Sequence, residues 1–177
     1  NIQKLMIGKI IDAGCGLGEA LESTKKYNLE LYGFDIADYA IKKLIDKYKS
    51  FINQKGFVVA QSCSLPWPDQ YFDNALSINF LDHMGFEKAQ ISVTEIARVM
   101  KSNGLLYAIL NSDRGISKKS IFFNDFKKNL NYDYYIIKNY YNKVKLFRLF
   151  EPLFKIKDYS LVKNKKQFYW KVLVKKI

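Results

Sequence analysis

The sequence predicts a single α/β domain with a doubly wound, mostly parallel seven-stranded sheet, helices on both faces and a C-terminal antiparallel hairpin. Three observations predict this fold class. Short apolar runs alternate with helical patterns up to residue 112, the first run ends in a cluster of glycines, and two alternating runs close the chain. A strand, a helix and a second strand in this order form a parallel pair with a right-handed crossover. The length of 177 residues suits one domain, residues 1–177.

The elements up to residue 112 follow from the spacing of apolar residues and from the turn residues between them. Apolar side chains recur at every third or fourth position over residues 37–49, which predicts an amphipathic helix. Pro66 and Pro68 restrict residues 65–70 to a loop, because proline breaks both helix and sheet hydrogen bonding. We expect strands over residues 9–13, 29–35, 57–60, 72–79 and 105–110, and further helices over residues 19–27 and 87–101.

The last third of the chain has a different pattern. Residues 113–150 contain helical segments with little strand character. Two alternating runs follow, at 154–162 and 168–174, and the polar residues 163–167 join them. Such a pair is typical of a hairpin, so we expect the sheet to end in antiparallel strands.

Composition excludes several classes of protein. With 49% hydrophobic residues the chain is not a disordered one, and no apolar run approaches the roughly 18 residues of a membrane span. The two cysteines, Cys15 and Cys63, show no metal-binding spacing and no second pair, so we expect neither a disulfide framework nor a metal site. Reduced thiols fit a cytoplasmic protein.

The formal net charge of +12 lies entirely in residues 111–177, which hold 17 Lys/Arg and 5 Asp/Glu, whereas residues 1–110 hold 12 of each. Two interpretations stay open. The simpler is a solvated, lysine-rich surface, since lysine is abundant in chains encoded by AT-rich genomes. The other is a face that binds polyanions.

A glycine loop carries the chemical information. The segment Asp12-Ala13-Gly14-Cys15-Gly16-Leu17-Gly18 follows the first strand. Glycines let the chain turn sharply and let a ligand approach the backbone, and the helix that follows points its N-terminus at that ligand. Asp35 ends the next strand about 20 residues further on, where a carboxylate accepts ribose hydroxyls. The combination predicts a cofactor that contains a nucleoside.

The spacing of the loop distinguishes between cofactors. Glycine repeats here as G-x-G-x-G after Asp12, not as the dinucleotide pattern G-x-G-x-x-G. The loop resembles motif I of the class I S-adenosylmethionine-dependent methyltransferases, in particular the small-molecule branch with a type 11 methyltransferase domain. Residues 33–36, 65–73, 77–84 and 95–105 resemble later segments of that family in the same order, so the resemblance covers residues 8–112. It implies a Rossmann-like fold, with S-adenosyl-L-methionine as the cofactor.

The resemblance also implies roles for individual residues. Residues 1–112 would form the cofactor-binding half, and residues 113–177 the substrate side. Asp35 would bind the ribose diol, and Ile36 would lie against the adenine. The methionine end would be held by Asp12, Gly14, Cys15, Gly16 and Gly18 together with Asn79 and Phe80, and the adenine edge by Gln61, Ser62 and Cys63. Gln61 stands where the family usually has an aspartate that accepts from the adenine amine.

Methyl transfer is an in-line displacement, so the enzyme mainly aligns the reactants and excludes water. A general base is needed only when the nucleophile is protonated. His83, the sole histidine, and Asp82 follow the fourth strand and are the candidate catalytic residues. Each has a structural alternative: His83 as a residue that orders the loop, and Asp82 as a cap of the next segment.

Two absent motifs narrow the methyl acceptor. No Asn/Asp-Pro-Pro-Tyr/Phe follows the fourth strand, and no Pro-Cys nucleophile is present. We therefore expect an oxygen or nitrogen atom of a small metabolite. Arg114, Lys118, Lys119, Phe122, Phe123 and Phe126 have two interpretations: aromatic walls with cationic rims that suit an anionic acceptor, or aromatics that pack helices on the sheet, Phe126 among the core, with lysines that face water. The alternatives are an RNA acceptor, bound by the basic C-terminal third, and a protein that binds the cofactor without catalysis.

Only about eight residues precede the first strand. We therefore also expect either that the lid over the cofactor is missing or that the pocket is open.

Overall fold

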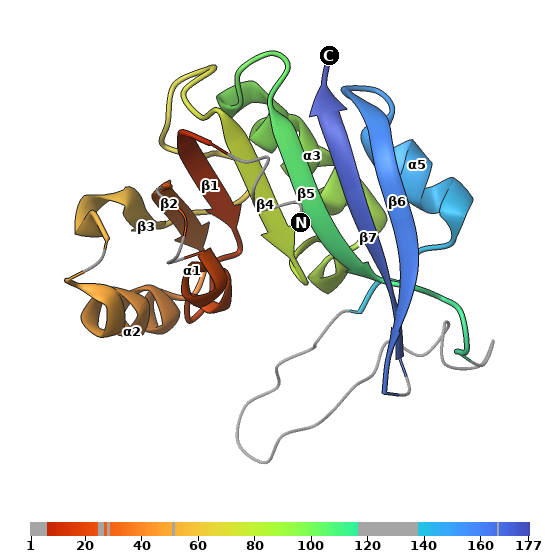
Figure 1. The fold of residues 1–177 in the computed structure, drawn as a ribbon, viewed down its shortest axis with the longest axis horizontal. Helices are drawn as coiled ribbons and strands as arrows, with labels where there is room; N and C mark the ends of the chain where they lie inside the picture. The colour runs from red at the N-terminus through yellow and green to blue at the C-terminus, as the bar shows by residue number, and fades with distance from the viewer. Residues whose placement is uncertain (1–6, 25–26, 28, 51, 117–137, 166) are drawn as a thin grey trace.

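The computed structural model describes residues 7–24, 27, 29–50, 52–116, 138–165 and 167–177. A seven-stranded sheet of order β3-β2-β1-β4-β5-β7-β6 runs through the molecule (Figure 1). The strands are β1 (Lys9–Ala13), β2 (Glu30–Asp35), β3 (Phe57–Val59), β4 (Asn74–Ile78), β5 (Leu105–Asn111), β6 (Phe154–Asn164) and β7 (Gln167–Lys176). Strands β1 to β5 are parallel, whereas β7 pairs antiparallel with both β5 and β6. The predicted fold class is confirmed.

Helices cover both faces of the sheet (Figure 1). The helices are α1 (Glu19–Thr24), α2 (Asp38–Tyr48), α3 (Phe86–Val99) and α5 (Lys143–Phe150), with short 3-10 turns η2 (Gln54–Gly56) and η3 (Leu81–His83). Side chains alternate along β1, so Ile10 is buried with α1 and α2, whereas Ile11 and Ala13 are buried with α3 and α5. Burial on both faces explains why the parallel strands read as continuous apolar runs.

Several elements differ in extent from the prediction. Helix α1 spans Glu19–Thr24 among the described residues and does not include Tyr27, and β4 begins at Asn74, since Phe72 forms an isolated bridge with Met100 instead. The strands of the hairpin extend into the polar segment expected to join them, as far as the pair Asn164–Gln167. Backbone pairing needs no apolar side chains, so the alternating pattern underestimated the hairpin.

The strand order reverses between β1 and β4, and this position determines where a ligand can bind. In open α/β sheets the crevice lies at the carboxyl ends of the strands at such a switch point. Gly14 follows β1 there with φ +69, and a Cβ on it would lie 2.2 Å from the ring of Phe80, which follows β4. Only glycine therefore allows the two loops to approach each other this closely.

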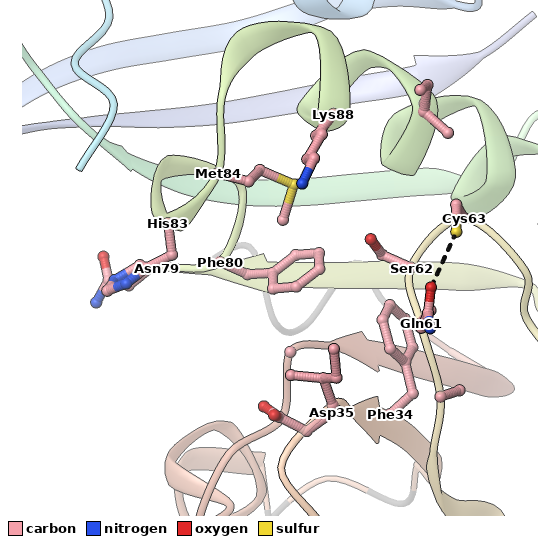
Figure 2. Close-up of a pocket in the computed structure, with 14 residues that line it drawn as sticks. Phe34, Asp35, Gln61, Ser62, Cys63, Asn79, Phe80, His83, Met84 and Lys88 are labelled. Atoms are coloured by element: carbon pink, nitrogen blue, oxygen red, sulfur yellow. Dashed lines mark hydrogen bonds between the residues drawn. The ribbon is translucent and has the colours of Figure 1, made fainter. Parts of the chain in front are cut away.

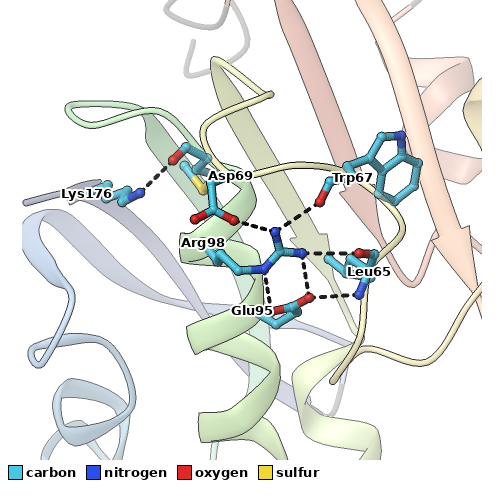
Figure 3. A network of polar contacts seen from close by, with 7 residues as sticks. Leu65, Trp67, Asp69, Glu95, Arg98 and Lys176 are labelled. Atoms are coloured by element: carbon cyan, nitrogen blue, oxygen red, sulfur yellow. Dashed lines mark hydrogen bonds and ion pairs between the residues drawn. The ribbon is translucent and has the colours of Figure 1, made fainter.

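The segment between β3 and β4 contains no helix and is fastened to α3 instead (Figure 3). Arg98 donates from Nη2 to the carbonyl of Leu65 at 3.1 Å, and from Nη1 to the carbonyl of Trp67 at 3.0 Å and to Asp69 Oδ1 at 2.6 Å. Glu95 accepts the amide of Leu65 at 2.8 Å. These bonds satisfy backbone groups that a loop otherwise leaves unpaired. The loop is therefore held against α3, although its prolines exclude it from helix and sheet.

Membrane spans, disulfides, metal sites and the substrate side were also subjects of the sequence analysis. No described helix is long and apolar enough to cross a membrane. Cys15 and Cys63 are free, and no described group of three His, Cys, Asp or Glu residues could hold a metal. Among the residues expected on the substrate side, Lys118, Lys119, Phe122, Phe123 and Phe126 lie outside the described residues.

Candidate cofactor site

A cavity of about 590 Å³ lies at the carboxyl ends of the parallel strands (Figure 2). Nine of the residues predicted from the sequence line it, namely Gly14, Asp35, Ile36, Gln61, Ser62, Cys63, Asn79, Phe80 and His83. Asp12, Cys15, Gly16, Gly18 and Asp82 are not among the lining residues. The structure thus brings together predicted residues from the ends of four strands.

Five further lining residues were missed by the sequence analysis, namely Phe34, Ala60, Met84, Lys88 and Ile91. Lys88 and Ile91 are spaced by three residues in the first turns of α3, whereas Met84 precedes the helix in an extended conformation. The spacing of Lys88 and Ile91 marks one face of a helix and is the signal that could have found these two residues.

The carboxylate of Asp35 is held by the backbone of the two loops that flank the cavity. Its Oδ2 accepts the amide of Gly16 at 3.0 Å, and its Oδ1 accepts the amide of Ala37 at 2.9 Å. Each carboxylate oxygen keeps a lone pair, since an ionised carboxyl has about four acceptor sites. A pair of vicinal hydroxyls suits such an acceptor, as the sequence predicted for a ribose.

Below the glycine loop, Asp12 is buried beside Asp35. Burial raises the pKa of the Asp12 carboxyl to about 7, and the negative charge of Asp35 adds to the effect. Burial, with the charges of Asp12 and Asp35, also raises the pKa of the Cys15 thiol, so Cys15 stays protonated and unreactive.

Next to Asp35, Gln61, Ser62 and Cys63 form the cavity wall that follows β3 (Figure 2). The Cys63 thiol donates to Gln61 Oε1 at 3.7 Å. The Ser62 hydroxyl lies 2.7 Å from the hydroxyl of Ser92, on α3. The polar side chains of this wall therefore already form hydrogen bonds with one another and with α3.

The two candidate catalytic residues lie differently. His83 is exposed and lines the cavity beyond Asn79. Asp82 is fully buried, and its Oδ2 accepts from the side-chain amide of Asn111. Its Oδ1 has no hydrogen-bond partner among the described residues. Burial raises the pKa of the Asp82 carboxyl, although the charge of His83 opposes the shift. The geometry thus brings only His83 to the cavity.

The cavity fits S-adenosylmethionine in size and in chemistry. Its Asp35 end offers acceptors for a ribose. A Cβ on Gly16 would meet nothing within 4 Å, so this backbone is open to a close approach. The carboxyl of Asp12 is buried in the strand before the same loop and does not line the cavity.

Comparisons with known proteins agree with this geometry. The sequence model of the methyltransferase domain family matches residues 11–108. The mRNA cap guanine-N(7) methyltransferase of Cryptococcus neoformans is 29% identical over 114 residues, which are 55% of this chain and 18% of the relative. Ajmaline N-methyltransferase of Rauvolfia serpentina is 26% identical over 111 residues, 61% of this chain and 38% of the relative. The chain thus spans less than half the length of the curated relatives it matches here.

A solved structure extends the similarity to nearly the whole chain. The SAM-dependent methyltransferase of Methanosarcina mazei superimposes with a TM-score of 0.81 and 22% identity, over 96% of this chain and 92% of that one. Because the family model matches more than half of the sequence, the chain belongs to the methyltransferase domain family, with the fold of its S-adenosylmethionine-dependent members.

Proposed function

We propose that this chain transfers a methyl group from S-adenosylmethionine to an oxygen or nitrogen atom of a small, anionic acceptor. One observation carries the proposal: a single cavity extends from Asp35 to His83 and Lys88. Lys88 forms no ion pair with a described residue, so its ammonium is available to an anionic group. Carboxylates and phosphates are the groups that such a cation attracts.

The chain's residues would act by binding, orientation and proton transfer. S-Adenosylmethionine supplies an electrophilic methyl group on a positively charged sulfur. Asp35 would hold the ribose, and Asp12 the cationic amino-acid end. The acceptor atom forms a bond to the methyl carbon as the bond from carbon to sulfur breaks, and the electron pair stays on sulfur. Where the methylated atom belongs to a hydroxyl or an amine, the imidazole of His83 would take the proton that this group loses, whereas a carboxylate oxygen needs no base.

Asp82 would support this site rather than act as a base. Its carboxyl is fully buried and is bound to Asn111, and Asn111 in turn accepts from the side chain of Gln167. This chain of polar side chains joins the end of β4 to β5 and β7. Removal of one partner from a buried polar chain leaves the others unsatisfied, which destabilises the fold.

A methyl-transfer screen tests the proposal. Radiolabelled S-adenosylmethionine is incubated with fractionated metabolites that include matched carboxylic acids and their amides. We expect incorporation into acids, and a loss of incorporation in Lys88→Ala with unchanged cofactor affinity. Incorporation that is equal for acids and amides would contradict the anionic acceptor, and full turnover by His83→Ala would contradict the base.

RNA is the second candidate acceptor, because aromatic rings and unpaired cations share one face of the hairpin. Lys143 lies 4.8 Å from the ring centroid of Tyr159, and Arg114 lies 5.3 Å from that of Phe168. Among described residues, no Lys or Arg of α5, β6 or β7 pairs with a carboxylate. Genome composition acts on the whole chain, yet residues 1–110 are neutral. Single-stranded nucleic acid binds such surfaces by stacking and phosphate contacts.

The salt dependence of RNA binding separates the two candidates. Fluorescence anisotropy with a labelled single-stranded RNA measures affinity at several salt concentrations. An RNA acceptor predicts a steep salt dependence that becomes shallower in Lys143→Glu, with Lys49→Glu on α2 as the control. Equal weakening by both variants would indicate non-specific attraction, which leaves the small acceptor.

A further inference from the structure

The hydroxyl of Ser92, on α3, lies behind the cavity wall and joins its two sides. Ser92 is 1% exposed. Its Oγ lies 2.7 Å from Ser62 Oγ, 2.9 Å from the carbonyl oxygen of Lys88 and 3.3 Å from Met84 Sδ. All three partners line the cavity, Ser62 from the segment after β3, and Met84 and Lys88 from the segment that begins α3 (Figure 2). One buried hydroxyl therefore contacts both walls.

The number of protons determines the direction of these bonds. A serine hydroxyl has one proton and two lone pairs, whereas a carbonyl oxygen and a thioether sulfur only accept. Ser92 therefore donates to only one of these two, and it receives the proton of Ser62. The proton of Ser62 is then directed away from the cavity. Ser62 Oγ keeps both lone pairs and acts towards the cavity as an acceptor.

Two acceptors follow each other on this wall. Gln61 stands where we expected the acceptor for the adenine amine, and one lone pair of its Oε1 accepts the thiol of Cys63 at 3.7 Å. Ser62 is the next residue, and its hydroxyl lines the same cavity. A group that donates from a purine edge beside Gln61 can therefore bond to the Ser62 hydroxyl.

Contacts with α3 fix the position of the loop that carries Ser62. Ser92, Glu95 and Arg98 are spaced by three residues on α3, and each bonds a part of the loop after β3. Figure 3 shows the contacts of Glu95 and Arg98. Glu95 and Arg98 fix the backbone of Leu65, three residues beyond Ser62. The position of Ser62 thus depends on α3, and the orientation of its hydroxyl depends on Ser92.

We propose that Ser92 is a positioning residue for cofactor specificity: it orients the Ser62 hydroxyl to accept from the exocyclic amine of the purine. This proposal rests on the proposed placement of the nucleoside between Asp35 and residues 61–63. Ser62 then favours an amine at the purine edge, because the amine donates a hydrogen bond to its oxygen. A carbonyl oxygen at the same place would face the Ser62 oxygen with no proton between them.

Calorimetric titration with two ligands tests the proposal. S-Adenosylhomocysteine carries the exocyclic amine, and S-inosylhomocysteine carries a carbonyl oxygen in its place. We expect the wild-type chain to prefer the amine, and Ser92→Ala to lose about fivefold in affinity for S-adenosylhomocysteine alone, as one hydrogen bond predicts. Ser92→Thr keeps the hydroxyl and should restore the preference.

Ser77→Ala is the matched control, since Ser77 is also fully buried and its hydroxyl has no hydrogen-bond partner among the described residues. It should leave the ratio of the two affinities unchanged. An equal loss for both ligands in Ser92→Ala, or an unchanged ratio, would overturn the proposal. Asp35→Ala separates this failure from a wrong placement of the nucleoside: unchanged binding of S-adenosylhomocysteine to Asp35→Ala would overturn the placement itself.

Discussion

Asp12 and Asp35 end neighbouring strands, and burial together with the charge of Asp35 holds the pKa of the Asp12 carboxyl at about 7. The two carboxyls differ in their surroundings. Two backbone amides donate hydrogen bonds to the Asp35 carboxylate, whereas no described group donates one to Asp12. The protonation of Asp12 therefore changes within the physiological pH range.

Cofactor affinity should consequently depend on pH. If the ionised Asp12 carboxyl holds the cationic end of S-adenosylmethionine, the fraction of competent protein increases about tenfold between pH 6 and pH 8 for a pKa of about 7. Calorimetric titration across this range measures it. Asp12→Asn should bind weakly at every pH, and a flat profile for the wild-type chain would contradict the role of Asp12.

The stability of the cofactor-free chain should show the opposite effect of Asp12. Its pKa in the folded state exceeds the model value of 3.8, so the folded chain binds the extra proton between these pH values and loses stability as pH increases towards 7. Above pH 7, Asp12→Asn should therefore be more stable by up to about 4 kcal/mol, which is 1.36 kcal/mol for each pKa unit. Thermal unfolding at pH 8 and at pH 4 measures this difference. A gain that is equal at both pH values would indicate a cause other than ionisation.

Asp35→Ala should weaken the binding of S-adenosylmethionine by more than about tenfold, because it removes acceptors for both the ribose and the loop amides. Asp38→Ala is the control, since Asp38 lies three residues further on and pairs only with exposed Lys42 on the surface of α2. Calorimetry or a thermal shift with S-adenosylmethionine measures both variants, with NAD as a ligand that should give no shift. Equal affinity of the two variants would argue against a ribose contact at Asp35.

Gly14→Ala should abolish cofactor binding, because its Cβ would lie 2.2 Å from the Phe80 ring and the backbone has φ +69. Phe80 would have to leave the cavity wall that it forms. Gly85→Ala is the matched control, since its Cβ would meet nothing within 4 Å. Binding by Gly14→Ala at the wild-type level would show that Phe80 moves without consequence for the site.

The extent of agreement between sequence and structure differs among the elements of the site. The glycine loop and Asp35 were predictable because turns with positive φ and strand ends leave local signals, as at Gly14. Lys88 and Ile91 were missed because their spacing is equally typical of a helix face buried in the core, and Met84 because it lies in the extended segment before α3. For Asp82, sequence position alone did not distinguish a residue at the cavity from one buried behind it.

The sequence by itself determined the order of strands and helices, the glycine loop and membership of the methyltransferase domain family, since each depends on residues close together in the chain. Only the tertiary structure decided that the Asp12 carboxyl is buried, that the hydroxyls of Ser62 and Ser92 are in contact, and how α3 holds the loop after β3. Asp12 lies beside Asp35, and Ser92 lies beside Ser62, across 23 and 30 positions of the sequence respectively. Such contacts follow from the packing of a helix against a sheet, which leaves no periodic trace in the sequence.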